Sequence, residues 1–131
     1  MPRLDGVLET ALYVDDLERS RRFYQTLFDF EAIVVSERLI AMSVAGRQVL
    51  LLFKKGASAQ LPVSAHDGDG QQHLAFAIPA AEWDGWHARL RKCGVSIEET
   101  RTWELGGRSV YFRDPDQHLV ELATPGVWSI Y

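Results

Sequence analysis

The sequence predicts an α+β protein made of two tandem βαβββ modules. Strand-like and helical periodicities occur in the same order in each half of the chain, and the first and last strands of the halves align residue by residue. A length of 131 residues is typical of one domain. We therefore expect a single domain over residues 1–131, with module 1 at about 7–56, a linker at 57–72 and module 2 at about 73–126.

The first module is predicted to open with a strand at 7–14, because the large apolar side chains Leu8, Leu12 and Val14 alternate there with Glu9, Ala11 and Tyr13. Asp16 offers a carboxylate that can cap a following helix. That helix is indicated by a buried face with spacings of three and four, comprising Leu17, Arg21, Tyr24, Leu27 and Phe28. Three short strands complete the module, at residues 32–35, 39–44 and 48–53.

The second module repeats this order after a loop at 54–72 that is rich in Gly, Ser, Ala and Asp. A strand is predicted at 73–78 and a helix at 79–93, which Gly94 ends. Strands then follow at 96–102, 108–113 and 119–123. When the two modules are aligned, Glu9 corresponds to His73 and Leu51 corresponds to Glu121.

A repeat of this kind relates equivalent positions around a shared axis, so residues 9, 51, 73 and 121 are expected to converge in one cavity. Three of them, Glu9, His73 and Glu121, are metal-ligand types. Glu121 stands in an apolar strand, where an ionised carboxylate is costly to bury without a partner. One neutral imidazole and two carboxylates suit a divalent cation and leave positions open for substrate. Mn, Fe, Ni and Zn all fit this set, and no other cofactor is expected.

Other residues have weaker functional interpretations beside structural ones. Tyr111 lies on the Glu121 side if the hairpin is regular, either as an acid/base group or as a packing residue. Trp103 and Arg108 are candidates for the border of the substrate pocket, and His66 for a lid. His87 and His118 are expected to be solvated.

Composition excludes some function classes. A net charge of −4 leaves no basic stripe for nucleic acid. Cys93 is the only cysteine, which points to a reducing compartment. No apolar run has the length of a membrane span, and the N-terminus lacks the apolar core of a signal peptide. We expect a cytoplasmic protein with neither nucleic acid nor membrane as a partner.

Two segments carry a family resemblance: residues 9–24, ETALYVDDLERSRRFY, and residues 111–122, YFRDPDQHLVEL. They resemble the vicinal oxygen chelate superfamily, which includes glyoxalase I, fosfomycin-resistance enzymes, extradiol dioxygenases and bleomycin-resistance proteins. The resemblance implies a curved mixed sheet around a cavity, a homodimer, and metal ligands at Glu9, His73 and Glu121. Leu51 departs from glyoxalase I, which has a fourth ligand there. Dioxygenases of this group carry a substrate-binding tyrosine at a spacing similar to that of Tyr111.

The resemblance implies a metal-dependent enzyme acting on a small oxygen-bearing substrate that chelates the metal. The expected chemistry is of the isomerase or lyase type or the extradiol dioxygenase type, and epoxide ring opening is a further alternative. Glu121, Tyr111 and Glu9 are the expected catalytic residues, and either carboxylate can serve as base by leaving the metal. The alternative is a non-catalytic protein that sequesters a drug or metabolite, as bleomycin-resistance proteins do.

Overall fold

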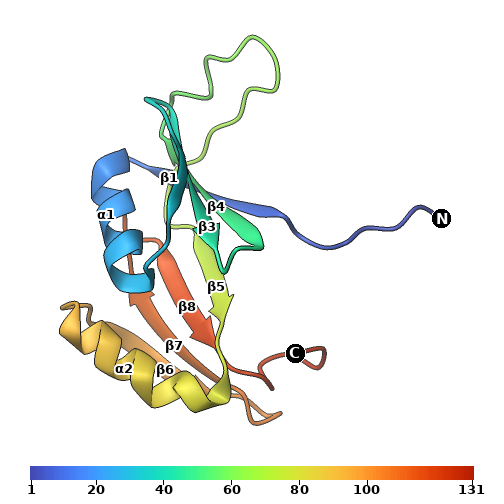
Figure 1. Cartoon of the computed structure of the whole chain (residues 1–131), viewed down its shortest axis with the longest axis vertical. Coiled ribbons are helices and arrows are strands. Elements are labelled where there is room, and N and C mark those ends of the chain that lie inside the picture. The colour runs from blue at the N-terminus through green and yellow to red at the C-terminus, as the bar shows by residue number, and fades with distance from the viewer. The chain divides into compact units, whose positions relative to one another are not determined.

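The computed structural model describes residues 1–131 and divides into two compact units. The N-terminal unit spans Met1–Asp69 and the C-terminal unit spans Gly70–Tyr131. Each unit contains one four-stranded mixed sheet with a helix beside it (Figure 1). The predicted α+β fold with a repeated βαβββ order is therefore confirmed.

The N-terminal unit contains β1 (Glu9–Val14), α1 (Leu17–Phe28), β2 (Ala32–Val35), β3 (Leu39–Val44) and β4 (Gln48–Lys54). Its strand order is β1-β4-β3-β2, with β1 parallel to β4 and the other pairs antiparallel. Helix α1 begins where Asp16 Oδ1 accepts a hydrogen bond from the Arg19 N–H at 3.0 Å, as the capping prediction requires. It ends at Asp29, which has a left-handed backbone with φ of 59°.

The C-terminal unit contains β5 (His73–Ala77), the short 3₁₀ helix η1 (Ala80–Glu82), α2 (Trp83–Lys92), β6 (Ile97–Thr102), β7 (Arg108–Arg113) and β8 (Leu119–Ala123). Its strand order, β5-β8-β7-β6, repeats that of the N-terminal unit, with β5 parallel to β8. Neither α-helix of the protein has the length and apolar character needed to cross a membrane.

Alternation along the strands separates two faces in each sheet. In the N-terminal unit, Leu12, Leu50 and Leu52 are buried, and α1 packs on β3 and β4. In the C-terminal unit, the matching core consists of Leu74, Leu90, Val110, Phe112, Val120 and Leu122. The strand residues between these buried positions face the opposite side, which includes Glu9 in one unit and His73 and Glu121 in the other.

His118 corrects one expectation, because it is fully buried rather than solvated. The turn before it closes tightly, since Asp114 Oδ1 accepts the N–H groups of Asp116 and His118, both at 2.9 Å. This draws the imidazole inward, where its Nδ1 accepts the Gln72 N–H at 2.9 Å. His87 is half-buried and its Nδ1 donates to the Trp83 carbonyl at 2.9 Å.

Candidate metal centre

The C-terminal unit brings His73 and Glu121 together. His73 begins β5, and Glu121 lies in β8 opposite Ala75, two residues farther along β5. Side chains two residues apart on a strand share a face, so both groups project to the side of the sheet away from the buried core. His73 Nε2 lies 3.3 Å from Glu121 Oε1.

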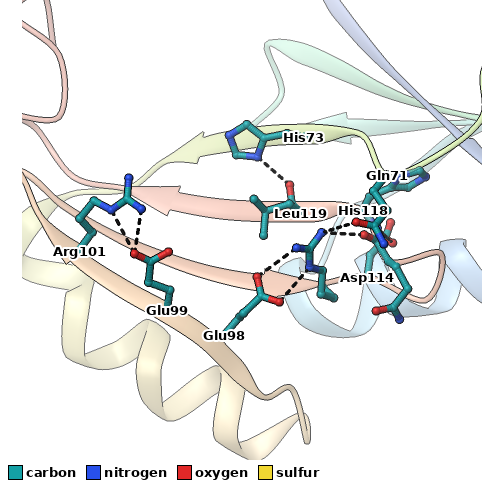
Figure 2. A network of polar contacts seen from close by, with 10 residues as sticks. Gln71, His73, Glu98, Glu99, Arg101, Asp114, His118 and Leu119 are labelled. Atoms are coloured by element: carbon teal, nitrogen blue, oxygen red, sulfur yellow. Dashed lines mark hydrogen bonds and ion pairs between the residues drawn. The ribbon is translucent and has the colours of Figure 1, made fainter.

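The other nitrogen of His73 determines what Nε2 can do. Nδ1 lies 2.9 Å from the Leu119 carbonyl oxygen, and Figure 2 draws this contact as a dashed line. A carbonyl only accepts hydrogen bonds, so Nδ1 carries a proton and donates it. A neutral His73 imidazole then has its lone pair on Nε2, directed toward Glu121. Ligand histidines in metal sites usually have this arrangement.

Glu121 is held by a hydroxyl on the neighbouring strand. Its side chain is 8% exposed, and Oε2 accepts a hydrogen bond from Ser109 Oγ at 2.5 Å. Ser109 is fully buried and its Oγ in turn accepts the indole N–H of Trp103 at 2.8 Å. The carboxylate therefore keeps one oxygen toward Ser109 and the other toward His73.

Tyr111 lies directly opposite Glu121 in the register of β7 with β8, so the predicted placement on the Glu121 side is confirmed. Its ring centroid lies 6.4 Å from that of His73. Burial raises the pKa of Tyr111 above its ordinary value of 10. The phenol therefore remains protonated at neutral pH and is a hydrogen-bond donor beside the carboxylate.

An arginine lies over the aromatic rings of this site. The Arg101 guanidinium carbon is 5.0 Å from the centroid of the Trp103 ring and 5.7 Å from that of Tyr111. Glu99 holds the same guanidinium, with Nη2 to Oε1 at 2.8 Å (Figure 2). Arg101 therefore makes cation–π contacts with both Trp103 and Tyr111.

Glu9 and Arg108, two further predicted residues, are each described within their own unit. Glu9 is exposed at the start of β1, opposite Val49 in the N-terminal unit. Arg108 lies with α2, its guanidinium carbon 4.4 Å from the centroid of the Trp83 ring, and the structure does not bring it to Glu121. No group of three or more His, Cys, Asp or Glu side chains is assembled in a form that could hold a metal ion.

His66 packs in the N-terminal unit. Its Nδ1 lies 2.7 Å from the Tyr13 hydroxyl, and its ring centroid lies 4.5 Å from that of Phe53. Tyr13 shares its face of β1 with Glu9. The loop that carries His66 is therefore anchored on the face of the sheet to which Glu9 belongs.

The pair formed by His73 and Glu121 fits a bound cation. A neutral imidazole and an ionised carboxylate both present lone pairs, so at 3.3 Å they repel unless a proton or a metal ion lies between them. The proton on Nδ1 and the hydroxyl on Oε2 leave Nε2 and Oε1 available as ligands. These two atoms are the part of the predicted ligand set that the structure brings together.

Sequence reasoning missed the hydrogen bonds behind Glu121. Alternation along the strand puts Ser109 on the same side as Tyr111 and Glu121, and a hydroxyl beside a buried carboxylate was a usable signal for its role. Nothing in the sequence pattern linked the indole of Trp103 to that hydroxyl, because the link depends on how the 102–108 turn folds back.

Comparison with known proteins gives a consistent assignment. Residues 6–122 match the model of the Glyoxalase/Bleomycin resistance protein/Dioxygenase superfamily. The fosfomycin resistance protein FosX of Listeria innocua is 33% identical, covering 91% of this chain and 89% of that protein. The metallothiol transferase FosB of Bacillus licheniformis is 31% identical, covering 94% and 77%.

Among solved structures, a lactoylglutathione lyase from Agrobacterium tumefaciens has a TM-score of 0.91 and 33% identity, covering 98% of this chain and 99% of that one. The curated relatives and this structure together support an enzyme of the superfamily.

Proposed function

The chain belongs to the Glyoxalase/Bleomycin resistance protein/Dioxygenase superfamily, and from this premise we propose that it is a divalent-metal-dependent enzyme that opens a small epoxide such as fosfomycin. The observation that carries the proposal is the 3.3 Å distance between His73 Nε2 and Glu121 Oε1, with the other polar atom of each side chain hydrogen-bonded elsewhere. The relatives named for fosfomycin resistance and thiol transfer favour this reaction over the lyase, isomerase and extradiol dioxygenase alternatives.

Glu9 is the proposed third ligand. Glu9 precedes Ala11 by two residues, and Ala11 pairs with Leu51. His73 precedes Ala75 by two residues, and Ala75 pairs with Glu121. This identical register makes Glu9 the counterpart of His73. Leu51 is then the counterpart of Glu121, so three protein ligands are available rather than the four that the resemblance to glyoxalase I requires.

Tyr111 is the proposed proton donor. A bound divalent cation supplies Lewis-acid activation of a substrate oxygen. The nucleophile, a thiol or water, attacks an epoxide carbon as the carbon–oxygen bond breaks. Tyr111, protonated at neutral pH, gives its proton to the released oxygen and regains one from the nucleophile. The product is a hydroxy thioether or a diol. For isomerase or lyase chemistry, Glu9 or Glu121 would instead be the base.

The first test is metal analysis of protein purified without an affinity tag, for wild type, His73→Ala and Glu121→Ala. We expect Mn, Fe, Ni or Zn near one equivalent in wild type and a loss of metal in both variants. Wild-type protein that contains none of these metals and binds none when they are added would refute the metalloenzyme.

The second test is turnover, followed by phosphorus NMR of fosfomycin with and without added thiol. We expect conversion that His73→Ala abolishes. Fosfomycin that binds but is not converted would instead support sequestration. Conversion of only a glutathione hemithioacetal or a catechol would replace epoxide opening with lyase or dioxygenase chemistry.

A homodimer is also proposed, from the family resemblance and from the exposed apolar edge strand β2. There Ile33, Val34 and Val35 are 51–56% exposed. Mixing Glu9→Ala protein with Glu121→Ala protein distinguishes two arrangements of the site. If Glu9 serves the metal of a second chain, the refolded mixture regains part of the wild-type metal content. If one chain supplies all three ligands, it does not.

A further inference from the structure

The hydrogen bonds behind Glu121 run in one determined direction. An indole N–H only donates, so Trp103 Nε1 donates to Ser109 Oγ at 2.8 Å. A carboxylate oxygen only accepts, so the Ser109 hydroxyl donates its hydrogen to Glu121 Oε2 at 2.5 Å. The indole N–H thus occupies a lone pair of Ser109 Oγ and holds that oxygen in place beside the carboxylate.

This direction fixes the carboxylate. Ser109 is fully buried, and Glu121 Oε2 gains a short, charge-assisted hydrogen bond from it. Rotation of the carboxylate away from Ser109 would break this bond, so Oε1 is held toward His73 Nε2.

The outer side of Trp103 is held by an ion pair. Every residue of β6 is exposed, yet this strand supplies Glu99 and Arg101. Arg101 lies over the Trp103 ring at 5.0 Å and is held by Glu99 at 2.8 Å (Figure 2). A cation over an indole face is attractive, and the planar guanidinium covers the ring.

We propose that Trp103, acting through Ser109, is a positioning residue for Glu121 as a metal ligand, and that Arg101 keeps the Trp103 indole in place. The proposal rests on the proposed metal centre and adds residues outside its ligand set. Groups that orient metal ligands typically change metal affinity by about 10-fold to 100-fold when removed.

The test measures Mn²⁺ and Co²⁺ affinity by calorimetry for wild type, Trp103→Phe, Ser109→Ala and the double variant. We expect Trp103→Phe to weaken binding about 10-fold and Ser109→Ala about 10-fold to 100-fold. The double variant should bind like Ser109→Ala alone, because the indole acts only through the hydroxyl. Arg101→Met should weaken binding less than Trp103→Phe does.

Trp128→Phe is the matched control, since Trp128 is 69% exposed. It should leave metal affinity and the Co²⁺ absorption spectrum unchanged, whereas Trp103→Phe should shift the spectrum. Ser109→Thr retains a hydroxyl and should recover part of the affinity that Ser109→Ala loses. Wild-type affinity in Trp103→Phe, or additive losses in the double variant, would overturn the proposal.

A measurement that does not depend on metal is the proton NMR chemical shift of the Trp103 indole N–H in the metal-free protein. It should move upfield in Ser109→Ala, because the hydrogen bond is lost. If wild type binds no metal, the proposed function fails and the positioning role fails with it, whatever this resonance shows. If wild type binds metal through Glu121 but Trp103→Phe binds equally well, only the positioning role fails.

Discussion

The two units share one topology but differ on one face of the sheet. On the helix-facing side, equivalent positions are apolar in both, as with Met42 and Phe112, which are both fully buried. On the other side, the N-terminal unit has Leu51 and Ala41 where the C-terminal unit has Glu121 and Tyr111. It also has Tyr13 and Phe53 where the C-terminal unit has Ala77 and Ala123.

The shared apolar face is required for folding, whereas the face that differs is where the candidate metal ligands lie. Packing against a helix requires apolar side chains in both units. The opposite face is released from that requirement, so one copy carries a hydrogen-bonded carboxylate flanked by small alanines. The other copy carries an aromatic pair that its own loop covers through His66.

Breaking the shared face should give the largest effect. Phe112→Ala should lower the free energy of unfolding by about 3 to 5 kcal/mol and Met42→Ala by about 2 to 5 kcal/mol, because each leaves a cavity in a packed core. Urea denaturation monitored by circular dichroism measures both. A loss below about 1 kcal/mol in only one of them would show that the helix-facing sides are not equivalent.

Substitutions at equivalent positions on the face that differs should have unequal effects on metal affinity in the two units. Glu121→Ala should reduce Mn²⁺ affinity by at least about 100-fold, more than the loss of an orienting group does. Leu51→Ala, at the equivalent position, should leave the affinity within about threefold, because Leu51 supplies no lone pair. Isothermal titration calorimetry gives both values, and equal losses would contradict the assignment of Glu121 as a metal ligand.

The covered face of the N-terminal unit can be tested at Gly68. A Cβ added to Gly68 would collide with the Tyr13 ring, so Gly68→Ala should cost about 1 to 3 kcal/mol and loosen the loop around His66. Limited proteolysis at residues 57–69 should accelerate. Gly85→Ala is the control, since a Cβ there meets nothing closer than 3.5 Å within α2 and should stabilise by up to about 1 kcal/mol.

The smallest effect concerns Tyr131, which ties the ends of β5 and β8. Its single hydroxyl hydrogen is shared between the carbonyl oxygens of Ala123, at 3.0 Å from the hydroxyl oxygen, and Ile78, at 3.2 Å. Burial raises its pKa above 10, so the folded chain retains the proton to higher pH than the unfolded chain. The stabilisation is complete below about pH 10 and is lost as the pH rises further.

Tyr131→Phe should therefore cost about 1 kcal/mol at pH 7. The gap between this variant and wild type should narrow above pH 10. Urea midpoints for both proteins at intervals from pH 7 to 11 measure it. A gap that widens at high pH would contradict the role of the phenolic proton.

The sequence by itself determined the order of the elements and the face on which His73 and Glu121 lie. Both follow from local periodicity, since alternation along a strand assigns each side chain to a face whatever the strand packs against. The repeat also made Leu51 the counterpart of Glu121, which the strand registers bear out. The ligand role of Glu9 stays a prediction.

Only the tertiary structure decided which groups hold the carboxylate and which histidine is buried. The Trp103 indole reaches Ser109 because a turn returns the chain from β6 to β7. His118 is buried because the backbone of the preceding turn binds Asp114 and because Gln72, distant in sequence, donates to its ring. These contacts form within or across turns, or join segments far apart in the sequence, so the strand and helix periodicities do not encode them.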